Sequence, residues 1–280
     1  MVGDEMKKVP TGIDGLDKML NGGLPSRRST LLCGSPGAGK TILSWQFLYN
    51  GAVRFNEPGL YVSLDEDTDE LKEEIASFGW GIRKGQAGEE VESIGWNIDR
   101  LEKEAKLAIV DASPIRLIPS EIRIGNISVG KRDFSLVSLM EIVKRKAEKI
   151  KAKRVAIDPI TALMLQYDDL SERRTAILDL FEALKKLGTT NLITTELKKV
   201  IMEREIHMEE YLAHGVIVLY TFMNNGEIFK SIRIEKMRGI AHDNQVRPYD
   251  ITSNGITVFP EEQLISSNAV ISTQQPQVQT

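Results

Sequence analysis

The chain has 280 residues, of which 41% are hydrophobic and 27% charged, a balance that excludes disordered, fibrous and membrane-embedded classes. Its formal net charge of −4 gives no overall electrostatic match to nucleic acid. The one cysteine, Cys33, excludes an internal disulfide and a cysteine-rich zinc site, and we expect it to be buried. With no signal-like start and no apolar run of roughly 18 residues, we expect a cytoplasmic protein without membrane insertion.

Apolar runs alternate with segments of helical periodicity along most of the chain. The apolar runs are typical of buried strands in a parallel sheet, and the periodic segments are typical of helices packed on that sheet. The order predicts an α/β fold, with a mostly parallel sheet flanked by helices. The predicted strands are 30–34, 59–64, 107–112, 154–158 and 191–195, and the predicted helices are 40–55, 68–78, 134–152 and 171–187.

The best-defined motif lies where the first of these strands meets the first helix. Gly34, Gly39, Lys40 and Thr41 satisfy G-x-x-x-x-G-K-S/T, the phosphate loop of nucleotide-binding proteins. Glycines allow the turns that aim successive amides inward, the lysine bridges phosphate oxygens, and the threonine hydroxyl can bind Mg²⁺. The alternative is a chance match, which the strand and helix around the motif disfavour. The predicted nucleotide contacts here are Gly34, Ser35, Pro36, Gly37, Ala38, Gly39, Lys40, Thr41 and Ile42.

Acidic residues at the ends of two other strands complete this chemistry. Asp158 ends a predicted core strand, and we expect it to hold Mg²⁺ together with Thr41. Asp65 and Glu66 follow the strand at 59–64, where parallel sheets gather their ligand groups, and they are candidates to activate water. The alternatives are helix capping by Asp158, and by Asp65 or Asp67.

The run of basic residues at 144–154 has two interpretations. It resembles a nucleic-acid patch in composition, but apolar residues recur within it on one helix face, which favours a solvated helix.

The C-terminal part of the chain has a different pattern. Segments 215–220, 228–237 and 256–259, with a turn at 224–227, predict a C-terminal antiparallel hairpin extension. The polar stretch 263–280 is predicted to be a disordered tail. We therefore expect one domain, 1–262.

A partial repeat interrupts this domain. "SFGWGIRK" and "SIGWNIDR" flank a polar segment, and we expect a loop insertion near 81–96. It is either a lengthened surface connection or a partner-binding element.

With these residues identified, the chain resembles the KaiC-like branch of the RecA/RadA superfamily of P-loop ATPases. The likeness covers roughly residues 8–260. It is carried by "PTGIDGLDKMLNGGLP", the phosphate loop, "FLYNG", "GLYVSLDE", "LAIVDASP", "LITTE", "IEKMRGIAHD" and "ITSNGITVFP". The sequence departs from the family pattern at Arg27, Pro159 and the segment near 81–96.

The resemblance implies a RecA-type core that forms a ring, by expectation a hexamer, with ATP at each interface between subunits. Asp65 and Glu66 match the family's water-activating acids, and Thr195 and Glu196 fall where the superfamily senses the γ-phosphate. Segment Lys236–Met237–Arg238 matches the cations that enter the neighbouring site, with His242 near the base; the alternative is a cross-strand charge pair on an exposed hairpin.

These features favour a Mg-dependent ATPase that couples nucleotide state to ring assembly or to a regulatory protein partner. One alternative is an ATP-gated module with little hydrolysis, similar to the ATP-binding component of the archaeal flagellar motor. A recombinase-like protein on single-stranded DNA is a less favoured alternative, since the chain is acidic and poor in aromatic residues. In the family's clock protein, the phosphorylated hydroxyls lie in the stretch that corresponds to Lys198–Tyr220. This chain has no Ser or Thr there, so the resemblance implies that clock-type autophosphorylation is not expected.

Overall fold

The computed structural model describes residues 6–77, 98–112, 121–124, 127–197, 206–224 and 226–262. The predicted insertion near 81–96 and the predicted tail 263–280 lie outside these ranges.

Nine of the described strands form one sheet, in the order β13-β12-β11-β10-β3-β9-β8-β4-β5. The six strands from β10 to β5 run parallel to their neighbours. This confirms the α/β prediction, and the buried apolar runs of these strands are those of a sheet covered on both faces. The parallel strands are β3 (Ser29–Gly34), β4 (Gly59–Ser63), β5 (Leu107–Asp111), β8 (Arg154–Asp158), β9 (Thr190–Glu196) and β10 (Gly215–Asn224).

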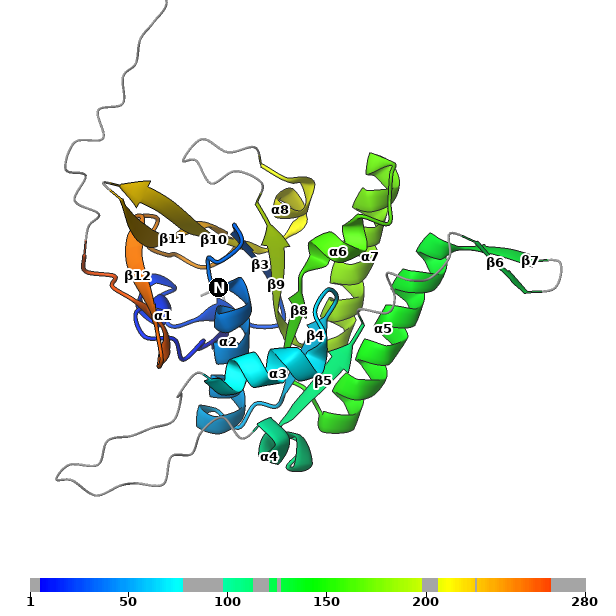
Figure 1. The fold of residues 1–280 in the computed structure, drawn as a ribbon, viewed down its shortest axis with the longest axis horizontal. Coiled ribbons are helices and arrows are strands. Elements are labelled where there is room, and N and C mark those ends of the chain that lie inside the picture. The colour runs from blue at the N-terminus through cyan, green and yellow to red at the C-terminus, as the bar shows by residue number, and fades with distance from the viewer. Residues whose placement is uncertain are drawn as a thin grey trace, which may run out of the picture.

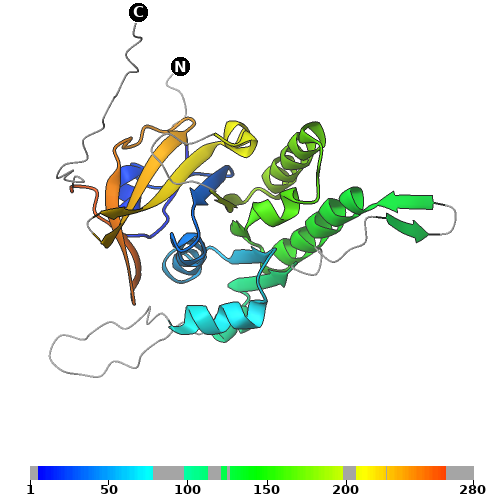
Figure 2. The ribbon, with the colours of Figure 1, turned by 45° about the horizontal axis from the view of Figure 1, so that its top comes forward.

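The C-terminal strands extend the sheet in antiparallel fashion (Figure 2). β11 (Glu227–Met237) returns along β10 as the predicted hairpin, and β13 (Gly255–Val258) covers most of the predicted strand at 256–259. Between them lies β12 (Arg247–Thr252), which the sequence reasoning missed. It contains Pro248 and alternates between apolar and polar side chains, so it lacks the continuous apolar run that marked the core strands.

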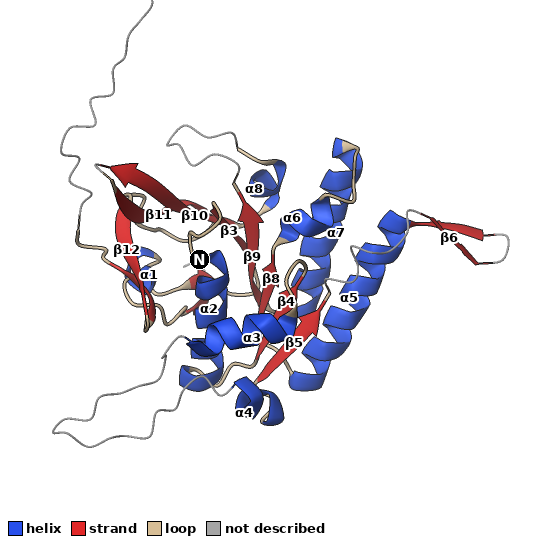
Figure 3. Cartoon of the chain, viewed as in Figure 1, coloured by secondary structure: helices blue, strands red, loops and turns tan. Residues whose placement is uncertain are grey.

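Helices cover both faces of the sheet, as Figures 1 and 3 show. They close one apolar core on each face, and the described residues also form two small two-stranded sheets. One face carries α1 (Leu16–Met19), α2 (Lys40–Arg54), α3 (Thr68–Ser77) and α4 (Ile98–Lys103), and the other carries α5 (Lys131–Ile150), α6 (Ile160–Met164), α7 (Leu170–Leu187) and α8 (Met208–Leu212). The small sheets pair β1 (Lys8–Val9) with β2 (Leu24–Pro25), and β6 (Glu121–Ile124) with β7 (Ile127–Gly130).

One residue of the basic run at 144–154, Arg154, is not exposed as the solvated-helix interpretation predicts. The lysines of α5 in this run are exposed, as predicted, but Arg154 opens β8 and is completely buried. Its guanidinium forms an ion pair with Glu57 at 2.7 Å, donates to the Phe47 carbonyl at 2.9 Å, and lies over the Phe47 ring. A buried arginine is tolerated when it is paired in this way, and its partners come from segments that the local sequence does not reveal.

The register of the sheet brings several strand ends together. Gly34 pairs with Glu196, and Ser63 pairs with Asp158, so the carboxyl ends of β3, β9, β4 and β8 meet at one edge. In open α/β sheets, ligands bind at this edge.

Candidate functional site

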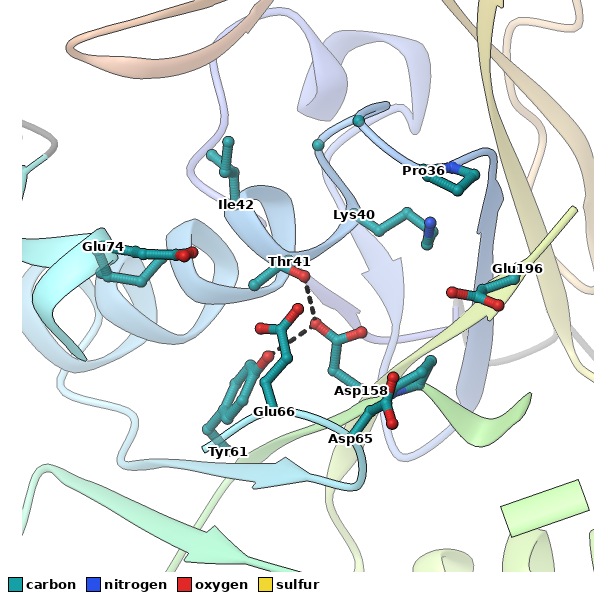
Figure 4. Close-up of a pocket in the computed structure, with 14 residues that line it drawn as sticks. Pro36, Lys40, Thr41, Ile42, Tyr61, Asp65, Glu66, Glu74, Asp158 and Glu196 are labelled. Carbon is teal, nitrogen blue, oxygen red and sulfur yellow. Dashed lines mark hydrogen bonds between the residues drawn. The ribbon is translucent and has the colours of Figure 1, made fainter. Parts of the chain in front are cut away.

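A cleft of about 370 Å³ opens at the carboxyl edge of the sheet (Figure 4). Ten of the predicted site residues line it, including the phosphate-loop lysine, both acids of the predicted water-activating pair and Asp158. The described lining residues are Pro36, Gly37, Gly39, Lys40, Thr41, Ile42, Tyr61, Asp65, Glu66, Glu74, Ile75, Asp158, Pro159 and Glu196.

The phosphate loop folds as its motif predicts. Gly37 and Gly39 have φ of 73° and 88°, values that favour glycine, and a Cβ at Gly37 would contact nothing within 4 Å. The Lys40 ammonium donates to the carbonyls of Gly34 and Ser35 at 3.0 and 3.1 Å. Burial lowers the pKa of Lys40, and the Asp158 carboxylate acts in the opposite direction. The loop therefore presents an open turn with one partly desolvated cation.

Two side chains of the C-terminal strands donate hydrogen bonds to carbonyls of the phosphate loop. The buried Tyr249 hydroxyl on β12 donates to the Ala38 carbonyl at 2.6 Å, and the Lys230 ammonium on β11 donates to the Gly37 carbonyl at 2.7 Å. The sequence reasoning assigned no role to Tyr249 or Lys230. Their contacts depend on the order of strands in the sheet, and no local motif marks them.

Asp158 is the centre of a hydroxyl network. Its Oδ2 accepts hydrogen bonds from the hydroxyls of Thr41 and Tyr61, both at 2.7 Å, and its Oδ1 accepts one from the Thr194 hydroxyl. The capping alternative is not what the structure shows, because Pro159 is the N-cap residue of α6 and no side chain caps that helix. Tyr61 and Thr194 were missed, since both lie within apolar strand patterns.

The acidic pair after β4 lies beside this network. A turn is fixed by the Ser63 hydroxyl, which donates to the Glu66 carbonyl at 2.6 Å and accepts from the Glu66 amide at 3.2 Å. Asp67, not Asp65, accepts the amides of the first turn of α3, so capping leaves both Asp65 and Glu66 at the cleft. Figure 4 shows the Glu66 carboxylate pointing toward Thr41 and Asp158. Partial burial, and next the Asp158 charge, raise the pKa of Glu66.

The two residues at the end of β9 differ in position. Glu196 lines the cleft, and its amide donates to the Thr161 hydroxyl at 3.1 Å. Thr195 is buried, and its hydroxyl donates to Glu209 of α8 at 3.2 Å. Thr195 is therefore connected to α8.

The predicted cation segment is not among the described residues that line the cleft. Across the sheet, Lys236 of β11 is level with Val216 of β10 and with Leu31 of β3. Leu31 lies three residues before the phosphate loop begins, so Lys236 is set back from the edge where the cleft opens. The Lys236 ammonium donates to the Glu210 carbonyl, and the Arg238 guanidinium donates to the Tyr211 carbonyl at 3.0 Å. Both cations thus lie against α8, away from their own phosphate loop.

The neighbouring members of that segment also lie away from the cleft. Met237 is buried in the apolar core, and the His242 ring hydrogen-bonds the Ile240 carbonyl at 3.2 Å.

The charges of the cleft are unbalanced. Five carboxylates line it, and Lys40 is the one cation among the described lining residues. A triphosphate entering this cleft therefore needs further positive charge.

The donor set fits Mg²⁺. Thr41 and Asp158 offer hard oxygen atoms that already lie within hydrogen-bond distance, and Mg²⁺ in nucleotide sites typically takes one or two such protein ligands and keeps several waters. Within the described ranges, no cluster of three or more His, Cys, Asp or Glu side chains is arranged to hold a metal by itself.

None of the helices that the structure describes is both long enough and apolar enough to cross a bilayer.

Comparison with known proteins places this arrangement in a family. The family model described as "ATPase: KaiC" matches residues 9–88 and 82–263. The UPF0273 protein MJ1359 of Methanocaldococcus jannaschii is 36% identical over 268 residues, which cover 92% of this chain and 99% of that protein. The crystal structure of the KaiC-like protein PH0186 from Pyrococcus horikoshii superimposes with a TM-score of 0.72 at 32% identity, covering 91% of this chain and all of that one.

Longer relatives match over part of their length. The circadian clock oscillator protein KaiC of Prochlorococcus marinus is 35% identical over 257 residues, which cover 91% of this chain. The chain spans 46% of that relative. The resemblance read from the motifs is confirmed: the chain belongs to the KaiC family and is a nucleotide-binding ATPase domain of the RecA type.

Proposed function

We propose that the protein is a Mg-dependent ATPase whose site is completed by a second copy of the same chain in a ring. The observation that carries this proposal is the charge imbalance of the cleft. Its five carboxylates face one lysine, while Lys236 and Arg238 are held on α8, away from their own phosphate loop.

The phosphate loop and Asp158 bind ATP with its metal ion. Amides from Gly37 to Thr41 and the Lys40 ammonium hold the phosphates, since Pro36 has no amide hydrogen to donate. Thr41 and Asp158 hold Mg²⁺, which when bound neutralises charge on the phosphates. Glu196 would lie at the γ-phosphate end of the cleft, with Thr195 behind it.

Glu66 orients and deprotonates the attacking water. Its carboxylate points toward Thr41 and Asp158, and its raised pKa makes it a stronger base than an exposed glutamate. Asp65 has a shorter side chain and assists. The phosphoryl group passes to water, and the products are ADP and phosphate.

Lys236 and Arg238 of a neighbouring copy supply the missing positive charge. Cations supplied across an interface stabilise charge on a transferring phosphoryl group, and such residues raise rates by about 10³–10⁵ in other P-loop enzymes. His242 follows Arg238 by four residues in the sequence, and we propose that it approaches the base. This arrangement is a head-to-tail contact, which closes into a ring when the rotation between copies allows it; we propose six copies.

Contacts made by α8 support a proposed route for coupling between neighbouring sites. α8 contacts the end of β9 through Glu209 and Thr195, and it contacts both cations through the carbonyls of Glu210 and Tyr211. A change at the γ-phosphate end of one cleft can thus reach the cations that serve the next. A regulatory protein partner that docks on the ring would act through this coupling.

A mixing experiment tests the proposal. One variant, Lys236→Ala with Arg238→Ala, keeps the cleft and loses the cations; the other, Glu66→Gln, keeps the cations and loses the base. Each is expected to be nearly inactive alone, and the mixture is expected to recover ATP hydrolysis, because cations of the second variant enter clefts of the first. A mixture no more active than the sum of its parts, with mixed rings shown by native mass spectrometry, would contradict action across the interface.

A further inference from the structure

Tyr61 is a buried side chain of β4 that reaches the cleft from below (Figure 4). Its ring stacks on the Trp45 indole with centroids 4.5 Å apart and planes 24° apart. Its hydroxyl donates to Asp158 Oδ2 at 2.7 Å. The phenol therefore joins the apolar core under α2 to the carboxylate that faces the phosphate loop.

Helix α2 contacts both partners of this hydrogen bond, Tyr61 and Asp158. Thr41 and Trp45 are four residues apart, so they lie on the same helix face one turn from each other. Thr41 contacts Asp158 directly, while Trp45 fixes the ring of Tyr61, which contacts the same carboxylate oxygen. The phosphate-loop helix thus holds Asp158 through two routes.

Hydrogen bonds on both oxygens fix the rotation of the Asp158 carboxylate. The terminal torsion of an aspartate is broad when nothing restrains it. Here Thr41 and Tyr61 donate to Oδ2 while Thr194 donates to Oδ1. A carboxylate has about four lone-pair sites, so the three described bonds leave one, on Oδ1, that could face a bound cation.

The direction of this hydrogen bond follows from the two groups that make it. A phenol hydroxyl has one hydrogen to donate, whereas an ionised carboxylate offers only acceptor oxygens. Tyr61 is therefore the donor and Asp158 the acceptor.

We propose that Tyr61 is a positioning residue for the magnesium ion: with Thr194, it orients Asp158 toward a Mg²⁺ bound with ATP. This inference rests on the proposed function, because it assumes the metal site at Thr41 and Asp158. Partners that orient metal-binding carboxylates typically change metal affinity by about 10–100-fold. The contacts of Tyr61 are with Asp158 and Trp45, so its proposed effect on the metal is transmitted through Asp158.

The test is calorimetric binding of a non-hydrolysable ATP analogue, measured once with Mg²⁺ and once with EDTA. Tyr61→Phe keeps the ring that stacks on Trp45 and removes only the hydroxyl. We expect it to weaken binding of the magnesium-loaded analogue by about tenfold and to leave binding of the metal-free analogue unchanged. A merely structural role for Tyr61 would weaken both forms alike.

The chain offers a matched control. Tyr220 of β10 is also buried and donates its hydroxyl to a carboxylate, that of Glu235, at 2.9 Å, but it is not among the described residues that line the cleft. Tyr220→Phe should leave both affinities unchanged. Thr194 donates to the other oxygen of Asp158. Thr194→Val should therefore also weaken binding of the magnesium-loaded analogue alone, and Thr194→Ser, which keeps a hydroxyl, should bind it as the wild type does.

The outcomes separate this inference from the proposed function. If the wild type gains affinity with Mg²⁺ and Tyr61→Phe gains as much, the role of Tyr61 is wrong while the metal site stands. An equal loss for both forms of the analogue also overturns the inference. If the wild type gains nothing from Mg²⁺, the proposed metal site itself fails and the inference falls with it.

Discussion

Replacing Glu66 with glutamine isolates the base of the proposed reaction. Glutamine has the same length and shape, and the turn that presents it is held by bonds between Ser63 and the backbone of residue 66, which the substitution does not touch. The change removes one of five carboxylates from the cleft. Affinity for ATP should therefore stay the same or rise, because repulsion of the phosphates falls.

The rate of the chemical step should fall steeply. A positioned general base contributes about 10²–10⁴-fold, which equals about 3–5 kcal/mol of barrier at about 1.36 kcal/mol per factor of ten. The upper part of this range is expected, since the raised pKa of Glu66 favours proton transfer. Asp65→Asn removes the same charge from a shorter side chain, and its rate should fall less than tenfold.

Single-turnover hydrolysis of radiolabelled ATP, with protein in excess, measures this step without product release. Glu74→Gln is the control for charge alone, because Glu74 lines the cleft and contributes to the raised pKa of Glu66. Its rate should change only a few-fold. A Glu66→Gln rate equal to that of the wild type, with ATP bound, would refute the assignment of the base.

The single-turnover rate should fall as the pH drops through the raised pKa of Glu66, because the base must be deprotonated, so the acidic limb should lie above the ordinary value of 4.5 and vanish in Glu66→Gln. Gly39→Ala should abolish calorimetric ATP binding, since φ is 88° and the new methyl group would lie 2.7 Å from an isoleucine of β12; Gly188→Ala, with φ of 70° and open space, should bind ATP normally. Tyr249→Phe should lower the free energy of unfolding in urea by about 1–3 kcal/mol by leaving a buried carbonyl unpaired, whereas the same change at the exposed Tyr211 should have no effect.

Much of the fold was predictable because its signals are local. The phosphate loop lies within one stretch from Gly34 to Thr41, and the residue types in that stretch dictate both the turn and the start of the helix. Asp158 was predictable for a related reason, since an acid at the end of a buried strand must face the edge where loops meet. The bounds of the predicted core helices and strands agree with the structure to within about three residues, because apolar periodicity determines them. The short helices α1, α4, α6 and α8 were not predicted, since each spans too few residues to show a period.

The residues that support the site were not predictable in the same way. Tyr61, Thr194 and Tyr249 lie in strands, where a hydroxyl among apolar residues is not marked by any spacing. Their partners are 97, 36 and 211 positions away in the sequence. Only the strand order and register bring each pair together.

Arg154 shows the converse failure of local reasoning. A run of basic residues predicts exposure, but whether an arginine can be buried depends on a carboxylate, a carbonyl and aromatic rings that surround it. Of those partners, Phe47 lies in the middle of α2, and Phe55 and Glu57 lie in the segment that follows this helix. The basic composition of the run therefore predicted exposure for Arg154, whereas its side chain is buried.

The most direct test of the account is the rate of ATP hydrolysis per chain as a function of protein concentration, with saturating Mg²⁺ and no nucleic acid. Analytical ultracentrifugation in the same buffer gives the state of assembly at each concentration. We predict that the rate per chain rises as copies associate, because each cleft receives Lys236 and Arg238 from its neighbour. A full rate that persists where the chain is monomeric would contradict the shared site.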